Sequence, residues 1–78
     1  MTDVRMEVLV EPFKENDPGP HVTAVVTAAR DAGLRVDMGP FATTVLGGVD
    51  EVVAASAPMM EAGFAAGATA IQLRVETL

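Results

Sequence analysis

The sequence contains no cysteine, tryptophan or tyrosine, and it has a single histidine and a single serine in 78 residues. Without cysteine, disulfides, iron–sulfur clusters, zinc ribbons and thiol catalysis are excluded. One histidine excludes metal sites built from several histidines, and there is no HExxH motif. Ser56 lies in the middle of an alanine-rich apolar segment, which is a poor position for a nucleophile. The sequence therefore predicts no catalytic residues and no metal site.

Basic residues are also scarce, with five Lys and Arg against eleven Asp and Glu, for a net charge of −6. Nucleic acids and anionic membrane surfaces require a cationic surface, so neither is an expected partner, whereas a small cation would be attracted. The longest uncharged runs have 12 residues, fewer than the roughly 20 needed to span a bilayer. The first residues do not resemble a secretory signal. We expect a soluble cytoplasmic protein.

Large apolar side chains are few, because 13 alanines and 12 valines make up most of the hydrophobic half of the sequence. A single core of this size supplies only about 3–5 kcal/mol, and small domains commonly compensate by self-association. We expect one domain spanning residues 1–78. We also expect a homodimer or homotetramer that uses an open sheet face or a strand edge.

The spacing of apolar residues predicts six elements. Alternation indicates a strand over residues 4–11 that ends at Pro12, and apolar residues at helical spacing indicate a helix around 22–29 that stops at Gly33. Further strands are predicted over 34–38, 41–46 and 68–76, with breaks at Gly39-Pro40 and at Gly47-Gly48. An alanine-rich helix is predicted over 49–66. Pro58 is expected to kink or split it.

This βαββαβ order favours an α+β, ferredoxin-like fold, with a four-stranded antiparallel sheet in the spatial order 4-1-3-2 and both helices on one face. The first and second strands then end at the same edge of the domain. We call this the loop edge; it comprises the 11–21 loop, the 39–40 corner and the connection after the second helix. The sheet face that points away from the helices carries charges of mixed sign, as in a solvated face or a polar interface.

The chemistry-bearing residues gather at the loop edge, where the candidate ligand-binding residues are Glu11, Phe13, Asp37, Gly39, Phe41, Thr43 and Thr44. Thr43 and Thr44 point to opposite faces of one strand, so only one of them is expected to face a pocket. Glu15 and Asp17 are interpreted as solvated loop charges, and His21 as a surface or capping residue at the start of the first helix. From the residues alone, a pocket for a cationic or planar heterocycle is supported only weakly.

Four stretches of the sequence carry a resemblance to a known family: VEPF (10–13), PGPHV (18–22), AGLRVDMGPFATT (32–44) and AGATAIQLRVE (66–76). They are similar to the small thiamine-binding protein family, ferredoxin-like domains that bind thiamine or its hydroxymethylpyrimidine moiety and were long without an assigned function. The resemblance implies a non-catalytic binding protein that assembles into dimers and tetramers. This sequence has Ala42 where glycine is expected in close relatives. The added methyl group leaves a ligand less room to approach the backbone near the 39–40 corner.

Thiamine suits the loop edge chemically. Its aminopyrimidine pairs well with a carboxylate, for which Glu11 and Asp37 are the candidates. Its thiazolium cation is stabilised by acidic and aromatic groups, here Phe13 and Phe41. Gly39 and one of the two threonines would fix its orientation. No resident cofactor is expected, and thiamine would be the bound ligand.

Two other functions stay open from the sequence. One is a ligand-free assembly or regulatory module. The other is a cofactor-free enzyme of the dimeric α+β barrel type, with His21 as its general base. An RNA-binding role is disfavoured, because the predicted open sheet face lacks the aromatic residues on which bases stack.

Overall fold

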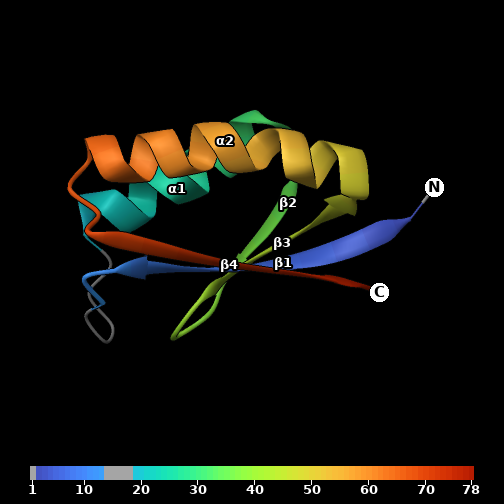
Figure 1. The fold of residues 1–78 in the computed structure, drawn as a ribbon, viewed down its shortest axis with the longest axis horizontal. Coiled ribbons are helices and arrows are strands. Elements are labelled where there is room, and N and C mark those ends of the chain that lie inside the picture. The colour runs from blue at the N-terminus through green and yellow to red at the C-terminus, as the bar shows by residue number, and fades with distance from the viewer. Residues whose placement is uncertain (1, 14–18) are drawn as a thin grey trace.

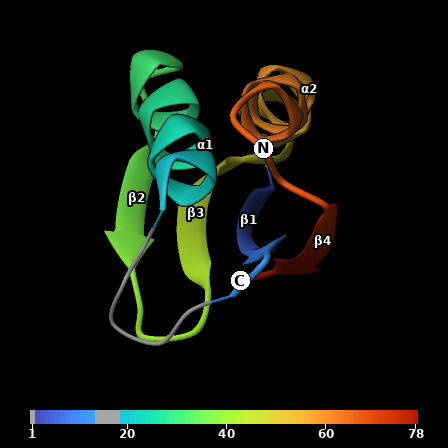
Figure 2. The same cartoon turned by 90° about the vertical axis from the view of Figure 1, so that its left-hand side faces the viewer.

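The computed structural model describes residues 2–13 and 19–78. Its elements are β1 (Asp3–Glu11), α1 (Pro20–Asp31), β2 (Arg35–Met38), β3 (Thr43–Gly48), α2 (Val49–Ala65) and β4 (Ala70–Thr77). The strands form one four-stranded sheet. Figures 1 and 2 show two layers, with α1 and α2 on one face of this sheet and the other face open. Neither helix in these ranges is long and apolar enough to cross a bilayer.

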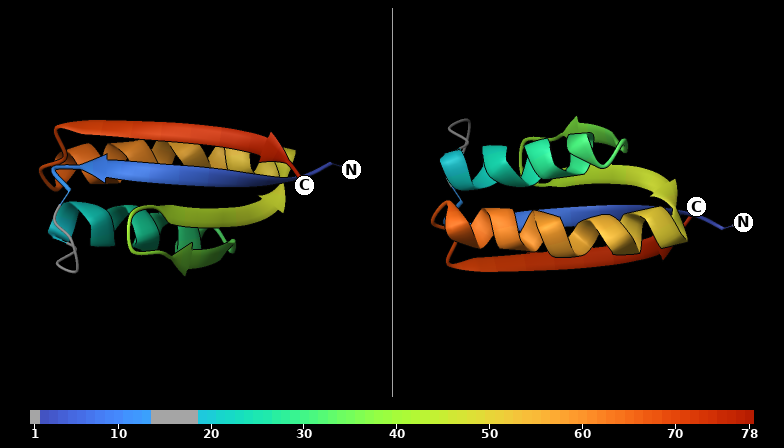
Figure 3. Two further views of the ribbon diagram at one scale, coloured as in Figure 1. Left: turned by 90° about the horizontal axis from the view of Figure 1, so that it is seen from below. Right: turned by 90° about the horizontal axis from the view of Figure 1, so that it is seen from above.

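The strands lie in the order β2-β3-β1-β4, which confirms the predicted order 4-1-3-2. β1 pairs antiparallel with both β3 and β4, and β3 pairs antiparallel with β2. β1 and β2 therefore run in the same direction and end toward the same side of the domain. The left view of Figure 3 shows the sheet from its open side, with β1 between β4 and β3 and with β2 at the edge. The predicted α+β fold is confirmed.

The core forms where every second side chain of β1 meets the helices. Val4, Met6, Val8 and Val10 are each at most 4% exposed, because alternate residues of a strand point to the same face. Buried residues from the rest of the chain complete this cluster: Val25, Ala29, Leu34, Val45, Val52, Ala55 and Met59.

Two of the predicted boundaries were wrong. Strand β3 begins at Thr43 rather than at residue 41, and it continues through the glycine pair, because Gly47 and Gly48 stay paired with β1. Helix α2 runs through Pro58 as one element, so the predicted split does not occur. Pro58 and Ala54, whose carbonyl loses its helical partner, are both exposed. Water is able to hydrate that carbonyl on the outer side of the helix.

Helix α2 approaches α1 and β4 closely at Gly63, a buried residue. A Cβ atom at this position would lie 2.8 Å from Cγ2 of Val25 and 2.9 Å from Cδ1 of Ile71. The end of the isoleucine side chain is able to move aside, but a β-branched valine in a helix has one strongly preferred rotamer. The glycine thus sets the spacing of the two helices.

Gly63→Ala is expected to destabilise the protein by about 1 kcal/mol, because overpacking costs about 1–3 kcal/mol and the better helix propensity of alanine returns about 1 kcal/mol. On a Val25→Ala background the same change should be stabilising, since the clashing methyl group is gone. Urea unfolding of the four proteins of this double-mutant cycle measures both effects. A gain in stability from Gly63→Ala alone would contradict this account.

Candidate functional site

His21 ties the start of α1 to the end of β1. Its side chain is only 9% exposed, and its Nε2 donates a hydrogen bond to the carbonyl oxygen of Pro12 at 2.7 Å. The ring lies against Gly19, where an added Cβ would be 2.7 Å from Cε1. The interpretation of His21 as a surface or capping residue was therefore wrong. Because the ring holds two segments together, the geometry does not favour the general-base role.

Phe13 and Phe41, the predicted aromatic candidates, are brought together. Their ring centroids are 6.0 Å apart and their planes are inclined by 31°, a favourable geometry for an aromatic pair. Both rings remain accessible, Phe13 being 44% and Phe41 65% exposed. The turn that carries Phe41 is closed by Gly39, whose N–H donates to the carbonyl of Ala42 at 3.0 Å. In Figure 1 this turn projects beyond the sheet on the side away from the helices.

The two threonines point to opposite faces, as predicted. Thr43 is 4% exposed and lies opposite Val8, on the side of the sheet that faces the helices. Thr44 lies opposite Glu7 and Asp37, on the open face.

The two predicted carboxylates are not brought together. Asp37 is on the edge strand β2, level with Glu7, and it forms a 4.0 Å ion pair with Arg35. Glu11 lies four residues farther along β1 and two strands away, a separation of about 17 Å between Cα atoms from ordinary sheet spacings. One pyrimidine ring does not reach both of them. Glu15 and Asp17 lie outside the described residues.

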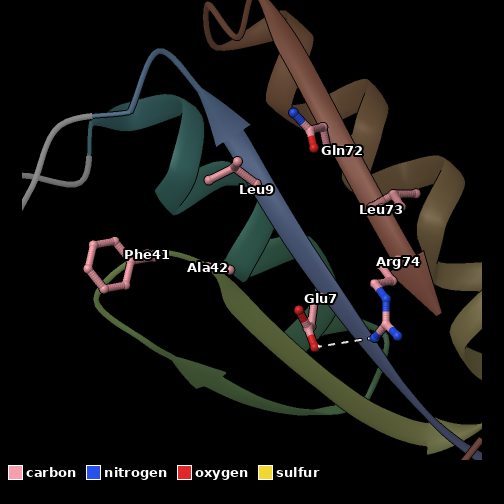
Figure 4. A pocket seen from close by; sticks show the side chains of 7 residues that line it. All are labelled: Glu7, Leu9, Phe41, Ala42, Gln72, Leu73 and Arg74. Atoms are coloured by element: carbon pink, nitrogen blue, oxygen red, sulfur yellow. Dashed lines mark ion pairs between the residues drawn. The ribbon is translucent and has the colours of Figure 1, made fainter. Parts of the chain in front are cut away.

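The open face contains a hollow of about 270 Å³, which we call the open-face hollow. It lies between β4 and the turn that carries Phe41, with β1 as its floor (Figure 4). Its lining residues are Glu7, Leu9, Phe41, Ala42, Gln72, Leu73 and Arg74. Of the predicted site residues, Phe41 alone is in this lining. The alternation of β1 and β4 had already placed Glu7, Leu9, Gln72 and Arg74 on the open face, but it gave no sign of a hollow there.

Four charged residues next to the hollow form a closed ring of ion pairs across β1 and β4. Arg74 Nη1 lies 2.9 Å from Glu76 Oε2 and 3.7 Å from Glu7 Oε1, and Arg5 pairs with both glutamates. Hydrogen bonds from Arg5, and then from Arg74, lower the pKa of Glu76 below its usual value. In the described ranges, no three acidic or histidine side chains converge as a metal site would require.

A family model described as thiamine-binding protein matches residues 6–77. The chain belongs to the thiamine-binding protein family. The match covers both the core strands and the open-face hollow. No curated protein matches the chain.

Solved structures share the fold at low sequence identity. A domain of unknown function from Bacillus cereus is 20% identical, with a TM-score of 0.71 over 99% of this chain and 75% of its own. A hypothetical protein from Methanocaldococcus jannaschii is 20% identical, with a TM-score of 0.67 over 100% and 80%. A putative thiamine biosynthesis/salvage protein from Thermotoga maritima is 22% identical, with a TM-score of 0.62 over 95% and 82%.

The ring of ion pairs predicts an acid-sensitive component of stability. Because the folded-state pKa of Glu76 is lowered, its contribution is present above the ordinary value of 4.5 and is lost as the pH falls through the folded-state value. Melting temperatures measured between pH 7 and pH 3 should therefore fall less steeply for Glu76→Gln than for the parent. Glu61→Gln, an exposed change on α2, is the control and should follow the parent. Identical slopes for parent and Glu76→Gln would contradict the assignment.

Proposed function

We propose that this protein binds thiamine or its hydroxymethylpyrimidine moiety without catalysis, in the open-face hollow beside Phe41. The proposal is carried by the family match over residues 6–77, and the hollow within that region supports it. Ligand pockets for drug-sized molecules measure about 300–1,000 Å³. A hollow of about 270 Å³ suits a molecule of one or two small rings.

The lining offers what a flat aminopyrimidine requires. Leu9 and Ala42 provide apolar surface, and Phe41 provides an exposed aromatic face at one end (Figure 4). Gln72 offers an amide donor and acceptor, while the carboxylate of Glu7 accepts from an exocyclic amine or a protonated ring nitrogen. The 3.7 Å separation of Glu7 from Arg74 exceeds hydrogen-bond distance. This carboxylate oxygen therefore has acceptor capacity left for a ligand.

The thiazolium cation would extend toward the loop edge. There the paired Phe13 and Phe41 provide cation–π surface, and the net charge of −6 attracts the cation over a longer range. In this proposal Gly39 shapes the turn that presents Phe41, and Thr43 supports it from the core side. Glu11 is the alternative carboxylate at the loop edge. Asp37 and Thr44 line the approach along β2 and β3.

Binding without turnover would serve storage, sensing or delivery of the vitamin, and we place the protein in the cytoplasm. We also propose that it acts as a homodimer or homotetramer. The core is built largely of valine and alanine, and self-association would supplement its limited stability.

Phe41→Ala is expected to weaken thiamine binding by about 1–2 kcal/mol, or roughly 5- to 30-fold in Kd, through loss of aromatic and cation–π contact. Phe64→Ala is the matched control, because Phe64 is also about half exposed but belongs to α2 in the helix layer. Titration calorimetry measures both affinities. Equal binding by the Phe41 variant and the parent would remove Phe41 from the site.

Glu7→Gln is expected to weaken binding by about 1.5–3 kcal/mol, the usual contribution of a hydrogen bond to a charged group. Glu11→Gln should have the smaller effect, since Glu11 does not line the hollow. Glu61→Gln is the control for removing one negative charge, and thermal unfolding checks that each variant is folded. A loss confined to Glu11→Gln would place the ligand at the loop edge instead of in the hollow.

A further inference from the structure

The open-face hollow is lined by one charged residue of each sign. Among the described residues, Arg74 is the only basic side chain in the lining and Glu7 is the only acidic one. The two point toward each other on the side of the hollow away from Phe41 (Figure 4). Whether the hollow can bind an anionic group therefore depends on whether Arg74 is free to receive it.

Arg74 is already paired with a residue outside the lining. Its Nη1 lies 2.9 Å from Glu76 Oε2, within the range of a charge-assisted hydrogen bond. Arg5 pairs with the same glutamate from the other side. Hydrogen bonds from Arg5, and then from Arg74, lower the pKa of Glu76, so its carboxylate stays ionised at neutral pH. The charge of Arg74 is thus balanced before a ligand arrives.

The charges beside the hollow offer an entering anion no net attraction. Arg5 and Arg74 contribute two positive charges, and Glu7 and Glu76 contribute two negative ones. The net charge of −6 on the whole chain repels an anion over a longer range. A phosphate monoester carries about −1.5 to −2 charges at neutral pH. It would have to displace Glu76 from Arg74 in order to bind there.

The chemistry of the proposed ligand places a phosphate beside Glu7. In hydroxymethylpyrimidine the amino and hydroxymethyl groups are on neighbouring ring carbons. An amine that donates to Glu7 therefore brings the hydroxyl oxygen, or a phosphate attached to it, close to the same carboxylate. In thiamine the same methylene group carries the thiazolium cation instead. Glu7 thus favours a neutral or positive group at this position and opposes a negative one.

We propose that the open-face hollow binds hydroxymethylpyrimidine as the free alcohol and excludes its phosphate ester, and that Glu76 sets this preference by occupying Arg74. Glu76 is a positioning residue, because it acts through the arginine. The side chain of Arg74 is 64% exposed, so without Glu76 it would be free to turn toward a phosphate. The preference rests on the proposed function, whereas the competition between Glu76 and a phosphate for Arg74 does not.

Titration calorimetry with hydroxymethylpyrimidine and its phosphate ester measures the preference as a ratio of two Kd values. The parent should bind the alcohol roughly tenfold more tightly or better, and Glu76→Gln should lower this ratio roughly tenfold. Glu76→Asp keeps the negative charge and should retain most of the preference. Glu61→Gln removes one exposed negative charge from α2. It is the matched control and should leave the ratio within about twofold.

The role of Arg74 is tested by a second substitution on the Glu76→Gln background. Adding Arg74→Gln should return the ratio toward that of the parent, because the group that would bind the phosphate is gone. A merely structural effect of Glu76→Gln would change both affinities alike and leave the ratio unchanged. Thermal unfolding checks that each variant is folded. A parent that binds both ligands equally, or a Glu76→Gln variant with the parent's ratio, would overturn the proposal.

Inorganic phosphate separates this inference from the proposed function, because it needs no pyrimidine site. Added phosphate should shift the backbone amide NMR signals of Gln72 and Arg74 in Glu76→Gln, but not in the parent at the same ionic strength. If the parent binds neither thiamine nor hydroxymethylpyrimidine while these shifts occur, the proposed function fails and the role of Glu76 stands. No shift in the folded Glu76→Gln variant would overturn that role, whatever the parent binds.

Discussion

The structure depends on β1, because this strand is paired on both sides and separates the core from the open face. Its inward residues Val4, Met6, Val8 and Val10 are nearly inaccessible to solvent. Its outward residues include the charged Arg5 and Glu7 and form the floor of the hollow. A shift of one residue in the pairing of β1 would exchange these two sets. The same register thus determines the stability of the core and the composition of the candidate site.

The second constraint is the contact that fixes the loop edge. The hydrogen bond from His21 to Pro12 joins the end of β1 to the first turn of α1. Gly19 permits it, because any larger side chain there would overlap the imidazole ring. Phe13 follows Pro12 directly, so this contact also determines where the Phe13–Phe41 pair stands. The single histidine of the chain accordingly has a positioning role in the structure.

The sequence predicted the elements and their order well, because alternation and helical spacing are local patterns that survive folding. It gave no sign of the open-face hollow, because a hollow combines segments whose relative register is not local information. Glu11 and Asp37 both lie near strand ends, yet β3 lies between their strands β1 and β2 and Glu11 is four residues farther along, which leaves them about 17 Å apart. The alternation of apolar residues in β1 predicted that Glu7 points outward. Its place in a hollow depends on how the turn at Phe41 projects over the open face, which no periodicity encodes.

The ring of ion pairs bears on how the proposed ligand site would be selective in a strongly acidic chain. The charges of two arginines and two glutamates cancel beside the hollow. The long-range attraction for cations therefore comes from acidic residues elsewhere in the chain. Salt screens this attraction. Arg74 Nη1 lies 2.9 Å from Glu76 Oε2 but 3.7 Å from Glu7 Oε1. The close pair of Arg74 with Glu76 thus keeps Arg74 from occupying the hydrogen-bonding capacity of the Glu7 carboxylate. Attraction over distance would bring many small cations to this surface, but only a flat ligand with a donor placed for Glu7 and a ring placed for Phe41 would use both groups at once.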